Sequence, residues 1–151
     1  MLLKRELVQV GLEAADANEA LRQVAQPFAD HGYAKPRFPQ AVIDRELMFP
    51  TGLPARGVDV AIPHADASYV IKDSLAIATL RNPVTFRMMG GGADALVQPR
   101  ILFMLGIVDA RTHLEALQRL MDLLNDEELL AACLACASPD ELYELMAERI
   151  G

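Results

Sequence analysis

The chain has 151 residues, 52% of them hydrophobic, and a formal net charge of -7 at pH 7. These values predict one folded domain over residues 1–151 and argue against a general nucleic-acid binder, which needs a concentrated basic surface. No secretory signal opens the chain, and the apolar run over residues 101–108 is too short to span a bilayer. The chain also has only two cysteines, which suits a reducing compartment, so we expect a cytoplasmic protein.

The first part of the chain predicts a strand followed by a helix. Residues 6–11 suit a short strand. Asp16, followed three positions later by Glu19, forms the capping-box pattern that opens a helix. Pro27 should kink or end that helix, because proline lacks the backbone N–H that a helix interior uses.

A second helix and a strand lead to the most distinctive motif. The helix is predicted over 39–48, where Arg45 lies beside the expected apolar positions Ala41, Val42 and Met48. Residues 49–57 are rich in the turn formers proline and glycine. Alternating apolar and polar residues predict a strand over 58–62, which must stop near Pro63 because proline cannot donate to a central ladder.

The second half of the chain predicts strands followed by helices. Strands are expected over 74–80, 84–86 and 101–108, and the last has the continuous apolar character of a strand buried on both faces. Thr112 and Glu115 form another capping box, and the helix after it should bury Leu114, Leu117, Leu120, Met121 and Leu124. Two more helices are predicted over 127–135 and 139–149. The order predicts an α/β fold with a mixed β-sheet flanked by helices.

His64 is the first candidate for chemistry, because it directly follows Pro63 at the predicted strand end. A rigid proline fixes the direction of the next side chain, and strand ends are where α/β sheets collect active groups. An imidazole there can act as a nucleophile or a proton carrier. The alternative is an ordinary surface or core histidine.

His113 and Arg45 are candidate anion-binding residues. His113 follows Thr112 in the first turn of a predicted helix, where free N–H groups and the helix dipole favour an anion; the alternative is a solvated residue. Arg45 either makes a solvated salt bridge or points inward and holds a phosphate with its planar guanidinium. If His64 carried a phosphoryl group, these two side chains would be placed to hold its oxygens.

Three other patterns are interpreted as structural. Cys133 and Cys136 have Cys-x-x-Cys spacing but fall late in an apolar stretch, so burial is expected rather than redox chemistry. The glycines at 90–92 lack the Lys-Ser/Thr of a phosphate-binding P-loop. No helix-spaced ligand pair supports a metal site, although one can be drawn from His64, Asp66, Asp109 and His113.

The segment RELMFPTGLPARGVDVAIPHAD (residues 45–66) resembles a known family. It is similar to the Arg-Glu, Pro-Thr-Gly and Ala-Ile-Pro-His pattern of enzyme IIA of the fructose–mannitol class in the bacterial sugar phosphotransferase system (PTS). The Phe-Pro-Thr-Gly spelling is most similar to the galactitol-type branch. The resemblance covers nearly the whole chain, including ILFMLGIVDARTHLEALQRLMDLL (residues 101–124).

The resemblance implies a phosphocarrier that needs no cofactor or metal. His64 would be the phosphorylated residue, accepting a phosphoryl group from HPr and passing it to a cysteine of enzyme IIB, which in turn serves the membrane enzyme IIC. His113 would support the phosphorylated imidazole, and Arg45 matches the motif arginine near the site. The partners would dock on an apolar rim of small residues, expected to include Ala61, Ala65 and Ala67. The implied role is uptake of a sugar or polyol such as galactitol; the alternative is a regulatory nitrogen-type IIA module that signals by its phosphorylation state.

Overall fold

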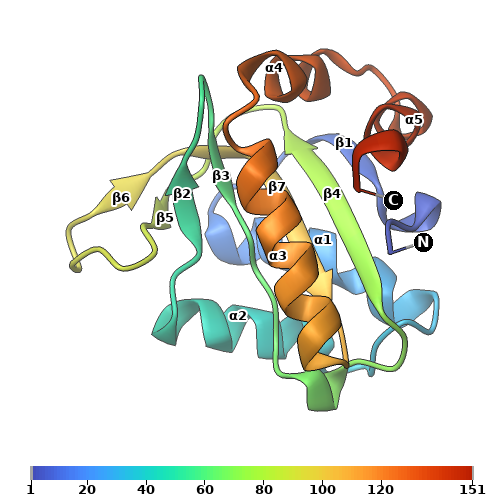
Figure 1. Cartoon of the computed structure of the whole chain (residues 1–151). Helices are drawn as coiled ribbons and strands as arrows, with labels where there is room; N and C mark the ends of the chain where they lie inside the picture. Colours follow the sequence, from blue (N-terminus) through green and yellow to red (C-terminus); the bar gives the residue numbers. More distant parts are fainter. Residues whose placement is uncertain (1, 151) are drawn as a thin grey trace.

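The computed structural model describes residues 2–150, which are built around a five-stranded mixed sheet (Figure 1). The strand order is β1-β4-β7-β3-β2, with β1 parallel to β4, β3 parallel to β7, and the other two pairs antiparallel. The strands are β1 (Gln9–Leu12), β2 (Gly52–Pro54), β3 (Asp59–Ala61), β4 (Ser74–Leu80) and β7 (Pro99–Gly106). A separate hairpin pairs β5 (Phe86–Arg87) with β6 (Leu96–Val97).

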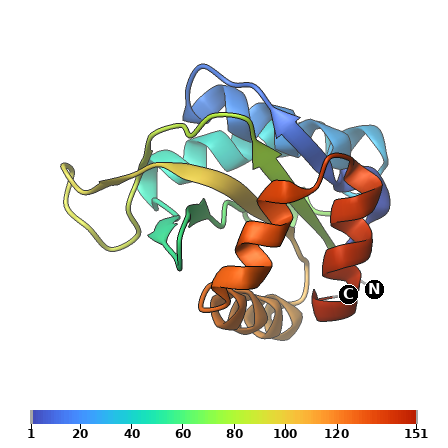
Figure 2. The ribbon, with the colours of Figure 1, turned by 90° about the horizontal axis from the view of Figure 1, so that it is seen from above.

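Helices cover both faces of the sheet, as the view from above shows (Figure 2). One face carries α1 (Ala17–Asp30) and α2 (Phe38–Met48), and the other carries α3 (Ala110–Leu123), α4 (Glu127–Ala135) and α5 (Pro139–Ile150). Two short 3-10 turns complete the fold, η1 (Arg5–Leu7) and η2 (Ala67–Tyr69). The predicted α/β fold with a mixed sheet flanked by helices is confirmed. Within residues 2–150, no helix has both the length and the apolar character needed to cross a membrane.

The central strands β4 and β7 separate two hydrophobic clusters. Every residue of β4 is buried, as is every residue of β7 except Arg100. Successive side chains point to opposite faces: Ala76, Ala78, Leu102 and Met104 pack toward α1 and α2, whereas Leu75, Ile77, Ile101, Phe103 and Leu105 pack toward α3–α5. The prediction that the apolar run at 101–108 is buried on both faces is confirmed for the part that forms β7.

Of the two outcomes predicted for Pro27, a kink or an end of the helix, the second is wrong, because α1 continues to Asp30. An interior proline leaves the carbonyl four residues earlier without its helical donor. That carbonyl belongs to Gln23, and it accepts a hydrogen bond of 3.0 Å from Gln9 Nε2 instead. A side chain from β1 therefore satisfies the group that Pro27 leaves open.

The capping prediction is confirmed for α1 and wrong for α3. The Asp16 carboxylate accepts from Glu19 N–H at 2.9 Å, as the capping box requires. The N-cap of α3 is Asp109 rather than Thr112, because the Asp109 carboxylate accepts from both the N–H and the hydroxyl of Thr112, each at 2.9 Å. The helix therefore begins at Ala110, before the expected start.

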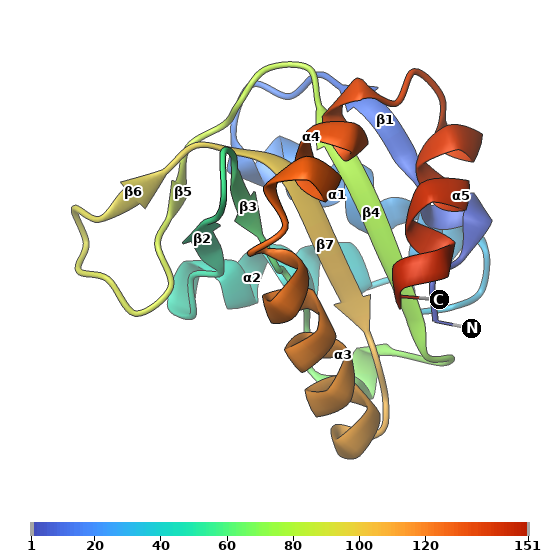
Figure 3. The same ribbon diagram turned by 45° about the horizontal axis from the view of Figure 1, so that its top comes forward.

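Some strand boundaries and apolar faces also differ from expectation. The first strand begins later than predicted, because residues 5–7 form η1. The segment expected as turns at 49–57 contains β2. Of the strand predicted at 84–86, only the last residue belongs to β5. Met48, Leu114 and Met121, expected in the core, are 75%, 55% and 42% exposed. The first turns of α3 extend past the end of β7 (Figure 3).

Candidate functional site

His64 lies at the carboxyl ends of the two parallel strands β3 and β7. Beyond β3 the chain stays beside β7, because Leu105 N–H donates to the Pro63 carbonyl at 3.1 Å and His64 forms a parallel bridge with Leu105. Pro63 has no N–H to offer and joins the sheet through its carbonyl alone. The backbone that carries the His64 imidazole is therefore held in place by β7.

His113 reaches the same place from α3, which follows β7 in the chain. The ring centroids of His64 and His113 lie 5.0 Å apart, and the rings meet edge to face at 65°. The His113 N–H bonds within the helix to the Asp109 carbonyl at 2.9 Å, so its backbone offers no free donor. Only the side chain of His113 faces the site.

Arg45 enters from α2 and completes a basic group around one hollow. Its guanidinium carbon lies 4.9 Å from the centre of the Phe49 ring, and its Nε is buried with no hydrogen-bond partner among residues 2–150. With His64 and His113 it lines a hollow of about 250 Å³, whose other walls are Ala65, Asp66, Ala67, Ile107, Val108 and Ala110. Ala61 is fully buried and does not belong to this rim, contrary to expectation.

A second hollow, of about 380 Å³, shares Arg45 and His64 with the first. It is lined in addition by Met48, Phe49, Pro50, Thr51, Met89, Gly90 and Gly91. The glycine-rich segment that follows β5 therefore reaches the histidine, although the sequence predicts only a plain loop there. Met48, Phe49, Met89 and Val108, the apolar rim of the site, are 39–75% exposed.

Both histidines are biased toward the neutral form. Burial is the largest cause that lowers the pKa of His64; the hydrogen bond to Ile62 opposes it, and the charges of Arg45 and of protonated His113 lower the pKa further. Burial, followed by the charge of Arg45, also lowers the pKa of His113. A neutral imidazole keeps one ring nitrogen unprotonated, which is the form that a nucleophile needs.

The backbone selects which ring nitrogen of His64 is unprotonated. His64 Nδ1 lies 3.0 Å from the carbonyl oxygen of Ile62. Because a carbonyl oxygen only accepts hydrogen bonds, Nδ1 carries the hydrogen in this geometry. The lone pair of the neutral ring is then on Nε2, the nitrogen at the far side of the ring from the backbone.

One buried residue near the site was missed by the sequence reasoning. Glu46 is only 9% exposed, and its carboxylate accepts from both the N–H and the hydroxyl of Thr51, each at 2.7 Å. Burial raises the pKa of Glu46, while the Thr51 hydrogen bonds and the charge of Arg87 oppose that shift. Two signals were available. Glu46 is the glutamate of the Arg-Glu motif in residues 45–66, and it falls four residues after Val42 and three after Ile43 on the buried stripe of α2.

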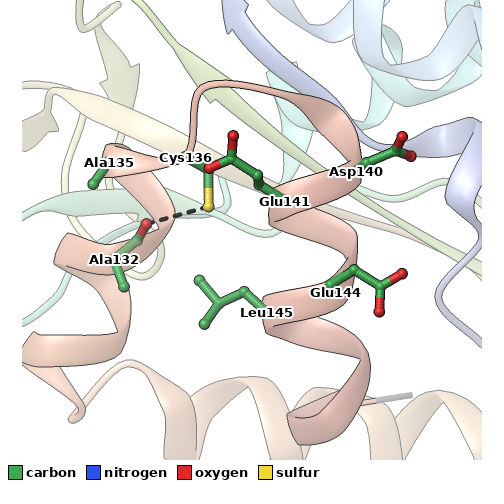
Figure 4. A pocket seen from close by; sticks show the side chains of 7 residues that line it. All are labelled: Ala132, Ala135, Cys136, Asp140, Glu141, Glu144 and Leu145. Atoms are coloured by element: carbon green, nitrogen blue, oxygen red, sulfur yellow. Dashed lines mark hydrogen bonds between the residues drawn. The ribbon is translucent and has the colours of Figure 1, made fainter.

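The cysteines lie away from these histidines and are not activated. Burial raises the pKa of Cys133 to about 12 and also raises that of Cys136, as expected for structural thiols. Cys136 borders a hollow of about 620 Å³ between α4 and α5, together with Leu145 and Glu141 (Figure 4). Its lining includes no histidine or arginine. Nor do three His, Cys, Asp or Glu side chains group as metal ligands anywhere in the described chain.

The comparisons with known proteins agree on one family. Its profile, described as "Phosphoenolpyruvate-dependent sugar phosphotransferase system, EIIA 2", matches residues 1–149. The chain is 28% identical over 151 residues to the mannitol-specific EIICBA component of the PTS of Escherichia coli K12, covering 97% of this chain and 22% of that relative. The chain therefore spans about a fifth of the length of this curated relative.

Two further similarities concern a galactitol protein and a complex. The galactitol-specific EIIA component of Escherichia coli K12 is 29% identical over 90 residues, which is 60% of each chain. A solved complex of enzyme IIAMTL and phosphorylated enzyme IIBMTL from Escherichia coli contains a chain with a TM-score of 0.79 and 27% identity, covering 98% of this chain and 100% of that one.

Proposed function

The chain belongs to the EIIA 2 family of the phosphoenolpyruvate-dependent sugar phosphotransferase system, and on this basis we propose that it carries a phosphoryl group on Nε2 of His64. EIIA components of this system are phosphotransferase components that transfer phosphoryl groups. In the proposed cycle, HPr is the donor and a cysteine of enzyme IIB is the acceptor. The observation that carries the assignment is the hydrogen bond between His64 Nδ1 and the Ile62 carbonyl, because it leaves Nε2 as the nucleophile.

Each transfer exchanges one phosphorus bond for another. In the first step the Nε2 lone pair of His64 forms an N–P bond while the N–P bond of phosphorylated HPr breaks, and that electron pair remains on the donor imidazole. In the second step a cysteine thiolate of enzyme IIB forms an S–P bond, and His64 recovers its lone pair. Such transfers depend mainly on positioning and on stabilising the phosphoryl charge.

Arg45 and His113 are proposed to hold the phosphoryl oxygens. Arg45 has a buried Nε with no partner in the described chain, and a phosphoryl oxygen would accept its hydrogen bond. The His113 ring lies 5.0 Å from that of His64, close enough to approach the same oxygens. Added negative charge on His64 should also raise the pKa of His113, so that the ring becomes a better donor after transfer.

The exposed apolar rim supports a role in docking. It consists of large side chains around a polar hollow, with Met48 75% and Phe49 56% exposed. Two partners that must each reach His64 and then leave need a small, transient interface. For enzyme IIB, the match to a chain of the solved complex with phosphorylated enzyme IIBMTL supports the same kind of encounter. The membrane enzyme IIC would be reached only through enzyme IIB.

The transported compound is proposed to be a sugar or polyol. Galactitol, indicated by the Phe-Pro-Thr-Gly spelling, is supported by the similarity to a galactitol-specific EIIA component. The similarity to the mannitol component covers more of this chain, 97% against 60%. Any test of transport should therefore include mannitol as well as galactitol.

The proposal is tested by incubating the protein with phosphoenolpyruvate, enzyme I and HPr. Wild type should acquire a phosphate that is labile in acid and stable in base, whereas His64→Ala should acquire none. His31→Ala is the matched control, because His31 is exposed at the end of α1. Equal labelling of His64→Ala and wild type would refute the assignment. Addition of enzyme IIB then separates a transport role, in which the label moves on, from a regulatory role, in which it stays.

A further inference from the structure

The buried carboxylate of Glu46 is connected to His64 by a continuous set of hydrogen bonds. Glu46 accepts from Thr51 twice, at 2.7 Å each. The Thr51 carbonyl accepts from Ile62 N–H at 3.2 Å, and the Ile62 carbonyl meets His64 Nδ1 at 3.0 Å. We call Glu46, Thr51 and Ile62 the Glu46 relay. It links the end of α2 to the ring of His64, and the contact with the ring is made by the Ile62 carbonyl.

We propose that Glu46 is a positioning residue that fixes the tautomer and direction of the His64 ring through Thr51 and Ile62. This inference rests on the proposed function, because it concerns the same imidazole. Thr51 precedes β2, whose residue Gly52 pairs with Ala61 in β3, so Thr51 lies beside the segment that leads to His64. If Thr51 moves, the Ile62 N–H loses its acceptor and the Ile62 carbonyl is free to turn away from Nδ1.

The chemistry of Glu46 suits this role. Two charge-assisted hydrogen bonds to one residue define its place more tightly than one neutral bond would. Arg87 supports the same region from β5 by donating to the carbonyls of Leu47 and Glu46. A carboxylate buried to this extent is retained only where such partners satisfy it.

A competing explanation is that β7 alone holds the histidine. Leu105 N–H donates to the Pro63 carbonyl at 3.1 Å, and this bond also restrains the strand end. Under that explanation, loss of the Thr51 contacts would affect stability without changing the imidazole. The two explanations therefore differ in what happens to the ring of His64.

The test is a series of substitutions read by two measurements. Nitrogen-15 NMR of the imidazole reports which ring nitrogen of His64 carries the hydrogen, and the initial rate of phosphorylation by HPr reports its reactivity. Glu46→Ala removes both contacts to Thr51, whereas Glu46→Gln can still accept from Thr51 N–H and donate to its hydroxyl. Thr51→Val removes only the hydroxyl contact, and it keeps the inference testable if Glu46→Ala does not fold.

The expected order follows from the contacts that each variant keeps. Glu46→Ala should mix the two tautomers and lower the rate by about 10- to 100-fold, as misplacement of a reacting group does. Thr51→Val should show a smaller change in the same direction, and Glu46→Gln should recover most of the wild-type behaviour. The matched control is Thr79→Val, since Thr79 is 4% exposed against 3% for Thr51 and also loses one hydrogen bond, to Gly11 N–H at 3.0 Å.

Two results would overturn the inference. One is a folded Glu46→Ala or Thr51→Val protein with the wild-type tautomer and rate. The other is a Thr79→Val protein that changes both readings as much as Thr51→Val does, which would indicate general destabilisation. If wild type itself accepts no phosphate, the proposed function fails, while the tautomer measurement still decides whether the relay orients His64.

Discussion

Gly52 is a position where even a methyl group should destabilise the fold. A β-carbon there would lie 2.5 Å from Val97 Cγ2 and 2.7 Å from the carbonyl oxygen of Arg87. The Val97 methyl can rotate, but the Arg87 oxygen belongs to the β5 backbone. Ordinary contact begins at 3.4 Å, so this oxygen is about 0.7 Å too close. Gly52→Ala must therefore push the β5–β6 hairpin away from β2.

The expected loss of stability combines two effects. Overpacking of this kind costs about 1–3 kcal/mol. Met89 N–H also donates to the Gly52 carbonyl at 2.8 Å, and stretching that bond removes part of the roughly 1 kcal/mol that a hydrogen bond contributes. We expect the free energy of unfolding to fall by about 1–4 kcal/mol, which corresponds to roughly 2–16 °C in Tm for a domain of this size.

The assay is urea and thermal unfolding of wild type, Gly52→Ala and Gly92→Ala. Gly92 is the matched control, because a β-carbon there would meet no atom within 4 Å. Its substitution should leave stability unchanged or raise it by about 0.4–1 kcal/mol, through a less flexible unfolded chain. The reasoning is refuted if Gly52→Ala unfolds like wild type, or if Gly92→Ala loses as much stability. Because Gly52 follows Thr51, the first variant should also be phosphorylated more slowly.

Two other predictions concern the histidines and the apolar rim. Burial lowers the pKa of His64 below its ordinary 6.5, so below that pH the unfolded chain binds more protons and the free energy of unfolding falls as the pH is lowered. Urea titrations between pH 5 and 8 should give a flatter dependence for His64→Gln, and an equally steep one would contradict the argument. Met48→Ser should lower kcat/KM for transfer to enzyme IIB by about tenfold with little change in stability, as expected at an interface anchor. Met121→Ser, also exposed but on α3 and absent from both histidine hollows, should leave transfer unchanged.

Elements with strong local patterns were predicted well. The strand at 74–80 and the helix at 127–135 have the predicted bounds, because each is marked by apolar residues within one segment. Errors had two sources. Gln9 of β1 satisfies the carbonyl that Pro27 leaves open, and this contact between two elements does not follow from the spacing of neighbouring residues. Asp109 rather than Thr112 caps α3, and here two capping residues three positions apart competed for one helix start.

In the candidate site too, residues with a local signal were predicted and a residue that depends on tertiary contacts was not. His64, His113 and Arg45 were selected from local context: a proline at a strand end, a helix start and an inward position on a helix. Glu46 was overlooked, because a glutamate beside an arginine on a helix is usually solvated. Its role depends on Thr51, which is brought to it by the turn after α2. The exposure of two apolar side chains was likewise misjudged, since Met48 and Leu114, expected in the core, are 75% and 55% exposed.

By itself, the sequence determined the α/β class, the order of the elements and the histidine at the end of β3, because these depend on local periodicity and on the rigidity of Pro63. Only the tertiary structure decided which groups meet. Parallel pairing of β3 with β7 sets His64 beside the strand that leads to α3, so that His113 comes within 5.0 Å between ring centres. The Ile62 carbonyl then determines which ring nitrogen of His64 carries the hydrogen. Such choices depend on backbone register between segments far apart in the chain, which residue spacing does not encode.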